Sequence, residues 1–169
     1  MKNNIILIGY MGCGKSSIGS RLSEIKEMNF LDTDVWIEEK EGRTISQIFE
    51  ENGETYFRDL ETKCLQILLK DTTNTVISVG GGLPVKEENR KLLHQLGTVI
   101  YLKAKADTIY ARLKGDTTRP LLQTDNPMQK IKDMMADREE KYQAAAHHVL
   151  TVDMKSITEL VEEIVEVAG

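Results

Sequence analysis

Eight residues near the N-terminus carry the strongest chemical signal in the chain. Residues 9–16 read Gly-Tyr-Met-Gly-Cys-Gly-Lys-Ser and fit G-x-x-x-x-G-K-[S/T], with an apolar run before them and a helical pattern after them. Such a loop points backbone N–H groups at phosphate oxygens, and the following helix adds partial positive charge. We expect Lys15 to reach the β- and γ-phosphates of a nucleoside triphosphate, Ser16 to bind Mg²⁺, and Cys13 to be a spectator.

A pair of carboxylates ends the second short apolar run. Because residues two apart in an extended segment face the same way, Asp32 and Asp34 are predicted to point into one site. One carboxylate could then serve Mg²⁺, while Asp34 accepts the proton of an attacking hydroxyl. The alternative is that Asp34 only caps the helix that follows it. The two aspartates alone leave both interpretations open.

Two arginines and a glycine run could form an acceptor pocket. Arg58 and Glu61 are three apart on a predicted helix and can pair, which would hold the guanidinium ready for a substrate carboxylate. The alternative is an exposed ion pair of little consequence. Gly80, Gly81 and Gly82 permit unusual dihedral angles and close approach of a ligand, although one glycine would suffice for a turn. Arg138 could join them or lie on a solvated helix face.

The elements that must position these residues alternate along the chain. Near-continuous apolar runs, typical of strands buried on both faces, occur at 5–8, 30–32, 76–79, 98–102 and 148–152. Helical patterns follow them, with core-facing positions that include Ile18, Leu22, Ile25, Ile67, Ile109, Leu113, Ile157 and Leu160. Gly97 and Gly115 stand where helices should end. This alternation predicts parallel βαβ units in a single three-layer α/β domain over residues 1–169.

Two stretches exceed what simple crossovers need. The mostly helical segment at 33–62 is interpreted as an acceptor-binding insertion, with an extra packing helix pair as the alternative. The polar loop at 114–127 is interpreted as a lid, with a plain surface loop as the alternative. Arg119 lies in that loop and could swing onto the phosphates.

Composition excludes several other classes of protein. The chain has 169 residues and a formal net charge of −5, which argues against a nucleic-acid or anionic-membrane partner. No apolar run approaches a membrane span and no targeting segment is apparent, so a cytoplasmic protein is expected. Only two cysteines occur, which predicts reduced thiols. No feature predicts a stable dimer, and a monomer is the default expectation.

Taken together, these residues resemble the shikimate kinase family along nearly the whole chain. The similar segments are Gly9–Ser16, Asp32–Asp34, Phe57-Arg58 with Glu61, Ser78–Gly82, Arg119–Leu122, and Arg138 with Tyr142. Their order and spacing match, and the combination is far more specific than the phosphate loop alone. The resemblance implies a P-loop fold like that of nucleoside monophosphate kinases, with a five-stranded parallel sheet, a lid and an acceptor-binding helical region.

The resemblance also implies roles for individual residues. The catalytic residues would be Asp34, Lys15 and Arg119, and the metal ligands of Mg²⁺ would be Ser16 and Asp32. The residues implied for ATP are Gly12, Cys13, Gly14, Lys15, Ser16, Ser17, Arg112 and Arg119. The residues implied for shikimate are Asp34, Phe49, Phe57, Arg58, Gly80, Gly81, Gly82 and Arg138. No adenine-contact signature is visible in Asp153-Met154-Lys155 after the last strand.

The implied reaction is transfer of the γ-phosphoryl group of ATP to the 3-hydroxyl of shikimate, giving ADP and 3-phosphoshikimate. The nearest alternative is another P-loop small-molecule kinase, such as a gluconate or nucleoside monophosphate kinase. A nucleotide-binding regulator without acceptor chemistry is a further alternative, but it would need no acceptor pocket. Positive charge is expected to gather in one cleft, while acidic residues such as Glu159 and Glu162 lie outside it.

Overall fold

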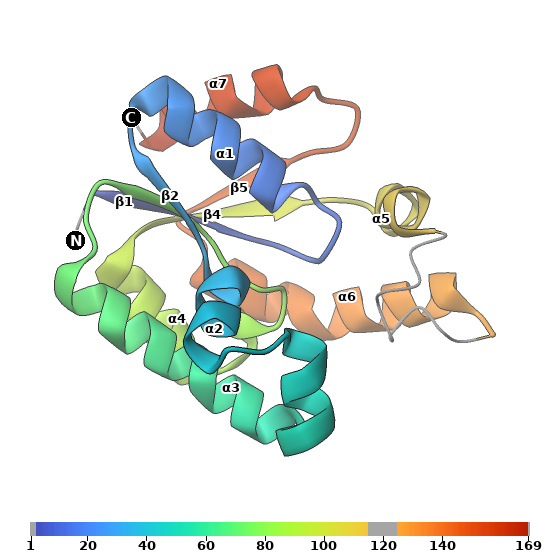
Figure 1. The fold of residues 1–169 in the computed structure, drawn as a ribbon. Coiled ribbons are helices and arrows are strands. Elements are labelled where there is room, and N and C mark those ends of the chain that lie inside the picture. Colours follow the sequence, from blue (N-terminus) through green and yellow to red (C-terminus); the bar gives the residue numbers. More distant parts are fainter. Residues whose placement is uncertain (1–2, 115–124, 169) are drawn as a thin grey trace.

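Five short strands form one parallel sheet at the centre of the molecule (Figure 1). The computed structural model describes residues 3–114 and 125–168. The strands are β1 (Asn4–Ile8), β2 (Asn29–Asp32), β3 (Thr75–Ser78), β4 (Gly97–Lys103) and β5 (His148–Thr151), in the order β2-β3-β1-β4-β5. In the register of the central strand, Ile6 lies opposite Ile77 on one side and Val99 on the other. The predicted five-stranded parallel sheet is therefore confirmed.

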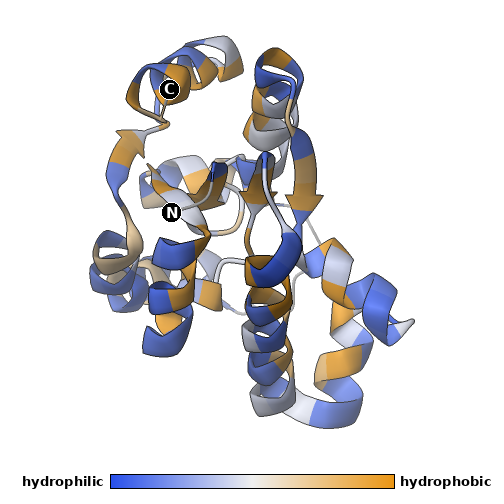
Figure 2. Ribbon diagram, turned by 90° about the vertical axis from the view of Figure 1, so that its left-hand side faces the viewer, coloured by the Kyte–Doolittle hydropathy of each residue, from blue (hydrophilic) through white to orange (hydrophobic). Residues whose placement is uncertain are grey.

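Helices cover both faces of this sheet (Figure 1). On one face lie α1 (Lys15–Lys26) and α7 (Ile157–Ala168), which contact each other. On the other face lie α3 (Ile45–Asp71), α4 (Glu87–Leu96) and α6 (Pro127–Ala145). The remaining helices are α2 (Thr33–Glu41), the short 3₁₀ helix η1 (Leu83–Val85) and α5 (Ala106–Leu113). Figure 2 shows hydrophobic central strands between helices with hydrophilic outer sides, which is the predicted three-layer arrangement.

The two edge strands are less buried than their apolar sequences predict. Every residue of β1 and β3 is buried, whereas Phe30 in β2 and Val149 in β5 are 38% and 41% exposed. Burial on both faces was thus a wrong prediction for β2 and β5, because each has a neighbouring strand on one side only.

Three residues predicted to face the core are exposed instead. Ile25, Ile67 and Ile157 leave 51%, 45% and 44% of their surface accessible. They lie in α1, α3 and α7, close to one end of each helix. Ile25 and Ile157 lie in the last and first turns of their helices, past the layer on which each helix packs. Ile67 lies between the buried residues Leu65 and Leu68, so it is exposed because it lies on the outer side of α3, although it follows the apolar periodicity.

Gly97 is needed for close packing rather than for a left-handed helix end. It follows α4 directly and begins β4 in extended backbone, with φ at 171°. A Cβ atom on Gly97 would lie 2.3 Å from the backbone oxygen of Asn4 in the neighbouring strand. The predicted helix end is therefore correct in position, but its physical reason is the approach of β1. Gly115 lies outside the described residues.

The predicted insertion at 33–62 contains α2 and the first two thirds of α3. A capping box formed by Thr44 and Gln47 begins α3, which then bends at Gly53, where φ is 85°. The predicted lid at 114–127, with Arg119, lies outside the described residues except at its two ends. In the described ranges no helix is long and apolar enough to cross a membrane.

Candidate active site

The phosphate loop curls between β1 and α1. Gly9, Gly12 and Gly14 have positive φ values of 150°, 80° and 99°, which favour glycine and allow the backbone to turn back on itself. The ammonium of Lys15 lies over the loop and donates to the carbonyls of Gly9 at 2.7 Å and Tyr10 at 3.1 Å. These are weak neutral acceptors, so the anionic oxygens of a phosphate could replace them.

Cys13 packs inside this loop rather than facing a ligand. Its side chain is only 1% exposed, and its N–H donates to the carbonyl of Tyr10 at 3.2 Å. The sulfur also fills the space beside Gly9, where a Cβ atom would lie 2.8 Å from it. This placement agrees with the predicted spectator role of the thiol.

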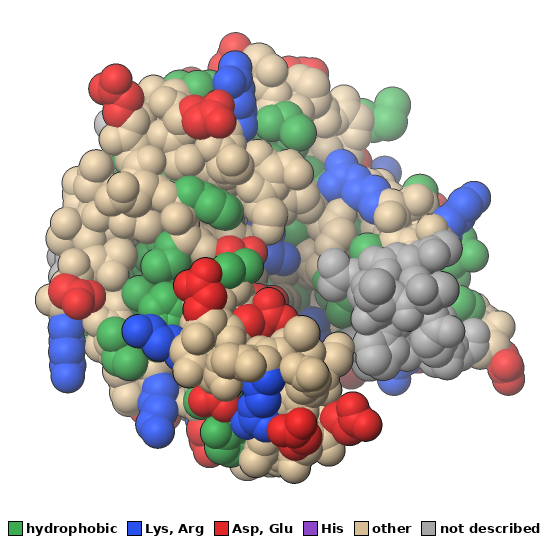
Figure 3. Space-filling model, viewed as in Figure 1, with side chains coloured by type: hydrophobic (Ala, Val, Ile, Leu, Met, Phe, Trp, Pro, Cys, Tyr) green, Lys and Arg blue, Asp and Glu red, His purple; other side chains and the backbone are tan. Residues whose placement is uncertain are grey.

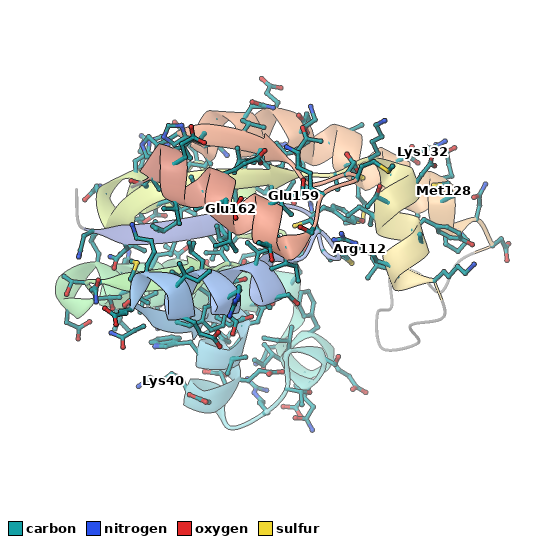
Figure 4. All side chains as sticks on the ribbon, turned by 90° about the horizontal axis from the view of Figure 1, so that it is seen from above. Lys40, Arg112, Met128, Lys132, Glu159 and Glu162 are labelled. Atoms are coloured by element: carbon teal, nitrogen blue, oxygen red, sulfur yellow. The ribbon has the colours of Figure 1, made fainter. Side chains whose placement is uncertain are left out.

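An arginine from a distant part of the chain reaches the same loop. Arg112 lies in α5 and donates from Nη1 to the carbonyl of Gly12 at 3.0 Å. Figure 4 shows its side chain pointing from α5 toward the connection between β1 and α1. The labelled acidic residues Glu159 and Glu162 belong to α7, away from the acceptor side of the site (Figure 4). The site therefore gathers cationic groups from elements that are far apart in sequence.

Asp32, and not Asp34, caps the helix that follows β2. Its Oδ1 accepts from the N–H groups of Asp34 at 2.9 Å and Val35 at 3.3 Å. Its Oδ2 accepts from the hydroxyl of Ser16 at 3.2 Å. The prediction of one extended segment was wrong, because α2 already begins at Thr33. Both carboxylates nevertheless line the same cavity.

Asp34 lies in the first turn of α2, and one of its carboxylate oxygens is buried. Among the described residues, its Oδ1 has no hydrogen-bond partner. Burial and the neighbouring carboxylate of Asp32 raise the pKa of Asp34 to about 6, against 3.8 for an ordinary aspartate, although Lys15 opposes the shift. A carboxylate in this state is ionised near neutral pH and is a stronger proton acceptor than an exposed one.

The predicted pair between Arg58 and Glu61 is present and is not a surface pair. Arg58 Nη1 lies 2.7 Å from Glu61 Oε1, and a second carboxylate, that of Glu54, lies 3.3 Å from Nη2. Glu61 is 1% exposed, and burial raises its pKa to about 7 in spite of the attraction to Arg58. The alternative of an exposed pair of little consequence is therefore wrong.

The glycine triplet makes room for side chains. None of the three glycines has a positive φ, so the predicted need for unusual dihedrals was wrong. A Cβ atom on Gly80 would lie 2.8 Å from Asp34 Oδ1, and one on Gly82 would lie 2.5 Å from the guanidinium nitrogens of Arg58. Charged side chains of the protein occupy the space that these glycines leave free. The groups that closely approach the glycine backbone are therefore Asp34 and Arg58, before any ligand binds.

Arg138 completes the acceptor side from α6. Its guanidinium carbon lies 5.6 Å from the centre of the Tyr10 ring, and Nη1 would be 3.4 Å from a Cβ atom on Gly81. The side chain is half-buried, so the alternative of a solvated helix face is wrong. Stacking on an aromatic ring holds a guanidinium in one pose while its N–H groups stay available.

Two cavities meet at the glycine triplet. One of about 300 Å³ is lined by the phosphate loop, Asp32, Asp34, Gly80 and Gly81. The other, of about 470 Å³, is lined by Arg58, Gly82, Arg138 and a rim of charged residues that includes Glu54, Lys86, Asp137 and Lys141. Figure 3 shows a hollow on the face drawn in Figure 1, bordered by acidic and basic side chains. A phosphate-binding loop thus adjoins an arginine-lined pocket.

Phe49 and Phe57 pack against each other beside this site. Their ring centres are 4.9 Å apart, and Phe57 is 4% exposed. Neither ring belongs to the described lining of the two cavities. Their predicted contact with an acceptor stays a prediction. Phe57 packs directly against Arg58, whose guanidinium lies 5.4 Å from the Phe57 ring centre.

The oxygen atoms beside the phosphate loop suit magnesium. Ser16 and Asp32 offer a hydroxyl and a carboxylate oxygen to the same cavity. Within residues 3–114 and 125–168 no three His, Cys, Asp or Glu side chains are arranged as a metal site. Such a sparse donor set fits Mg²⁺, which commonly keeps several waters and binds one or two protein oxygens together with phosphates.

Sequence reasoning missed the buried polar groups behind the site. Thr33, Thr62 and Asn89 are 0%, 7% and 0% exposed and all make hydrogen bonds in or next to the glycine segment. Tyr142 was noted only as part of the resemblance. Polar residues inside apolar helix faces were the available signal, but it does not reveal their partners.

Asp153, which follows the last strand, binds the start of α5. Its carboxylate accepts from Lys105 N at 3.0 Å and from Thr108 Oγ1 at 2.6 Å.

Comparison with known proteins adds an independent line of support. A family model described as shikimate kinase matches residues 11–168. A shikimate kinase of Sulfurihydrogenibium sp. is 42% identical over 161 residues, which is 95% of each chain. The solved structure of the Acinetobacter baumannii shikimate kinase in complex with shikimate has a TM-score of 0.91 at 38% identity, covering 97% of this chain and 91% of that one.

A gluconokinase, one of the alternative kinases, is similar to this chain in fold. A solved gluconokinase from Sinorhizobium meliloti has a TM-score of 0.60 at 16% identity, covering 98% of this chain and 90% of that one. A likeness at this level of identity shows a common fold alone, and it carries no argument for the acceptor.

Proposed function

The chain belongs to the shikimate kinase family, and we propose on that premise how its site transfers the γ-phosphoryl group of ATP to the 3-hydroxyl of shikimate. The observation that carries the proposal is the meeting of two cavities at the glycine triplet. One has the loop and lysine that a nucleotide requires, and the other has two arginines that suit a carboxylate. Asp34 lines the cavity of the phosphate loop beside Gly80, where the acceptor hydroxyl would meet the phosphate.

On the nucleotide side, the N–H groups of the phosphate loop and the ammonium of Lys15 would hold the β- and γ-phosphates. Ser16 and Asp32 would hold Mg²⁺, which when bound neutralises charge on the phosphate oxygens. Arg112, already bonded to the loop at Gly12, would lie against the adenine. Arg119 was predicted to stabilise the transferred group; it lies outside the described residues and stays a prediction.

On the acceptor side, Arg58 and Arg138 would bind the carboxylate of shikimate. Glu61 holds Arg58 from one side at 2.7 Å, and the Tyr10 ring supports Arg138. Guanidinium groups fixed in this way bind a carboxylate with little loss of side-chain entropy. The segment at 33–62 supplies Asp34, Arg58 and Glu61, which supports its interpretation as the acceptor-binding part of the single domain.

Asp34 would orient the acceptor hydroxyl and take its proton as transfer proceeds. The pKa of about 6 leaves it ionised at neutral pH, so it can accept a hydrogen bond before the reaction and a proton during it. The remainder of the catalysis is positioning and electrostatic stabilisation, because phosphoryl transfer needs little covalent help from the protein.

The proposal is tested by measuring ADP release with a panel of acceptors. Shikimate is compared with gluconate, with a nucleoside monophosphate and with no acceptor, at one concentration of Mg·ATP. We expect turnover with shikimate and at most trace release in the other reactions. The methyl ester of shikimate keeps all three hydroxyls but removes the charge that the arginines bind, and we expect it to be a poor acceptor. Release that is equally fast without any acceptor would contradict the proposal.

A further inference from the structure

The backbone from Gly80 to Leu83 is held by buried side chains that come from three helices. Thr33, Asn89 and Tyr142 are each at most 1% exposed, and each bonds one backbone group of this segment. The hydrogen bonds are Gly80 N–H to Thr33 Oγ1 at 3.2 Å, Tyr142 Oη to the Gly81 carbonyl at 2.6 Å, and Asn89 Nδ2 to the Leu83 carbonyl at 2.9 Å. The segment that joins the two cavities is thereby fixed to α2, α6 and α4.

Two of these three side chains, Thr33 and Tyr142, are close in sequence to residues proposed to bind the acceptor. Thr33 immediately precedes Asp34 in α2, and Tyr142 follows Arg138 by four residues, which is one turn of α6. Each link ties the backbone that carries a functional side chain to the glycine segment.

A third link runs through an intermediary. Thr62 follows Arg58 by one turn of α3, and its hydroxyl donates to Asn89 Oδ1 at 2.7 Å. Asn89 passes the connection on to the carbonyl of Leu83. All three proposed acceptor contacts, from three separate helices, are thus set relative to one stretch of backbone.

We propose that Tyr142 is a positioning residue for the acceptor, because its hydroxyl sets α6, and with it Arg138, against the glycine segment. This inference rests on the proposed function. Tyr142 makes the shortest of the three bonds, its ring packs on Tyr101 with centres 5.1 Å apart, and its hydroxyl is also hydrogen-bonded to the side chain of Arg138. The partly buried Gly81 carbonyl loses this donor when the hydroxyl is removed, so the segment has reason to shift.

The test is the substitution Tyr142→Phe, which removes only the hydroxyl. We expect the Kd for shikimate, measured by calorimetry, and the KM for shikimate to rise by about fivefold, the size expected for one buried hydrogen bond. The KM for Mg·ATP should change by less than about twofold, because the ammonium of Lys15 is held by the carbonyls of Gly9 and Tyr10 and not by the Tyr142 hydroxyl. A general loss of folding would lower the active fraction and leave both KM values unchanged.

Tyr101→Phe is the matched control. Tyr101 is 3% exposed, lies against Tyr142, and donates to Glu139, which neighbours Arg138 in α6. This variant also loses one buried hydroxyl bond to α6, but it leaves the glycine segment attached. We expect a lower melting temperature in both variants and a weaker affinity for shikimate only in Tyr142→Phe.

The outcomes separate this inference from the proposed function. If the unchanged protein phosphorylates shikimate but both tyrosine variants bind it equally well, the positioning role of Tyr142 is wrong and the function stands. Equal rises of the two KM values in Tyr142→Phe would also overturn the inference. If the unchanged protein does not use shikimate at all, the proposed function itself fails.

Discussion

Asp34 and Glu61 both lie beside Gly80 where a Cβ atom would project, and each brings a buried carboxylate oxygen that has no partner among the described residues. An added Cβ atom on Gly80 would lie 2.8 Å from Asp34 Oδ1 and 3.2 Å from Glu61 Oε2. Two carboxylates this close to one point repel each other when both are charged, and the charge of Asp34 adds to the burial that raises the pKa of Glu61. The arrangement is costly for folding, which makes it a good place to test function.

Replacing Asp34 by asparagine should preserve ATP binding and lower kcat by about 10²–10⁴-fold, the usual contribution of a general base. The amide can still accept a hydrogen bond, but it cannot take a proton at neutral pH. Steady-state ADP release gives kcat, and calorimetric titration with a nonhydrolysable ATP analogue gives nucleotide affinity. A turnover close to that of the unchanged protein would rule out the base role.

Replacing Arg58 by alanine should raise the KM for shikimate far more than the KM for ATP. A charged hydrogen-bonded contact is typically worth about 1.5–3 kcal/mol, which corresponds to roughly 10–150-fold. The measurement is the pair of KM values in the same assay. If the KM for shikimate does not change, Arg58 serves only to pair with Glu61 and Glu54.

Replacing Gly82 by alanine should weaken shikimate binding without straining the backbone. Gly82 has φ at −91°, which any residue adopts, but the new methyl group would lie 2.5 Å from the Arg58 guanidinium. The flexible end of Arg58 must move, so the KM for shikimate should rise while the melting temperature changes by only a few degrees. An unchanged KM would show that Arg58 binds equally well from its displaced position.

Replacing Gly97 by alanine should give the opposite result, namely lower stability with unchanged KM values. Here the methyl group would lie 2.3 Å from the backbone oxygen of Asn4, which is held in the central strand and cannot move aside cheaply. We expect a loss of about 1–3 kcal/mol in the free energy of unfolding, the usual cost of overpacking. Both KM values should stay unchanged, because Gly97 begins β4 at the end of the sheet opposite the site. Chemical denaturation and the same kinetic assay distinguish the two glycine variants.

Replacing Glu61 by glutamine should change how stability depends on pH. Burial raises the pKa of Glu61 to about 7, against 4.5 for an ordinary glutamate. Between these values the folded protein holds a proton that the unfolded chain releases, so this group lowers the free energy of unfolding as pH rises. Glutamine has no such proton and still offers Arg58 an acceptor.

Denaturation of both proteins at about pH 5 and about pH 8 tests this sign. The unchanged protein should lose stability relative to Glu61→Gln between the two conditions, by roughly 1–3 kcal/mol. A stability difference that is the same at both pH values would show that Glu61 is already ionised throughout. The pair with Arg58 would then outweigh the burial of the carboxylate.

Much of the fold follows from local sequence patterns. Apolar runs and helical spacing located all five strands and the helices between them, because burial of a parallel sheet between helix layers demands those patterns. The phosphate loop was equally visible, since its glycines and Lys15 are close neighbours in the chain. The exposed positions Ile25, Ile67 and Ile157 escaped this reasoning, because periodicity does not show how much of a helix, along its length or around its axis, a neighbouring layer covers.

The sequence by itself determined which chemistry the chain can do, because residue types and short spacings decide whether a loop can bind phosphate or a helix can pair Arg58 with Glu61. Only the tertiary structure decided how that chemistry is assembled. It paired the Asp32 carboxylate with the Ser16 hydroxyl, brought Arg112 to the phosphate loop, and put charged side chains in the space left by Gly80 and Gly82. These contacts join residues that are distant in sequence, and their geometry depends on packing that no local pattern encodes.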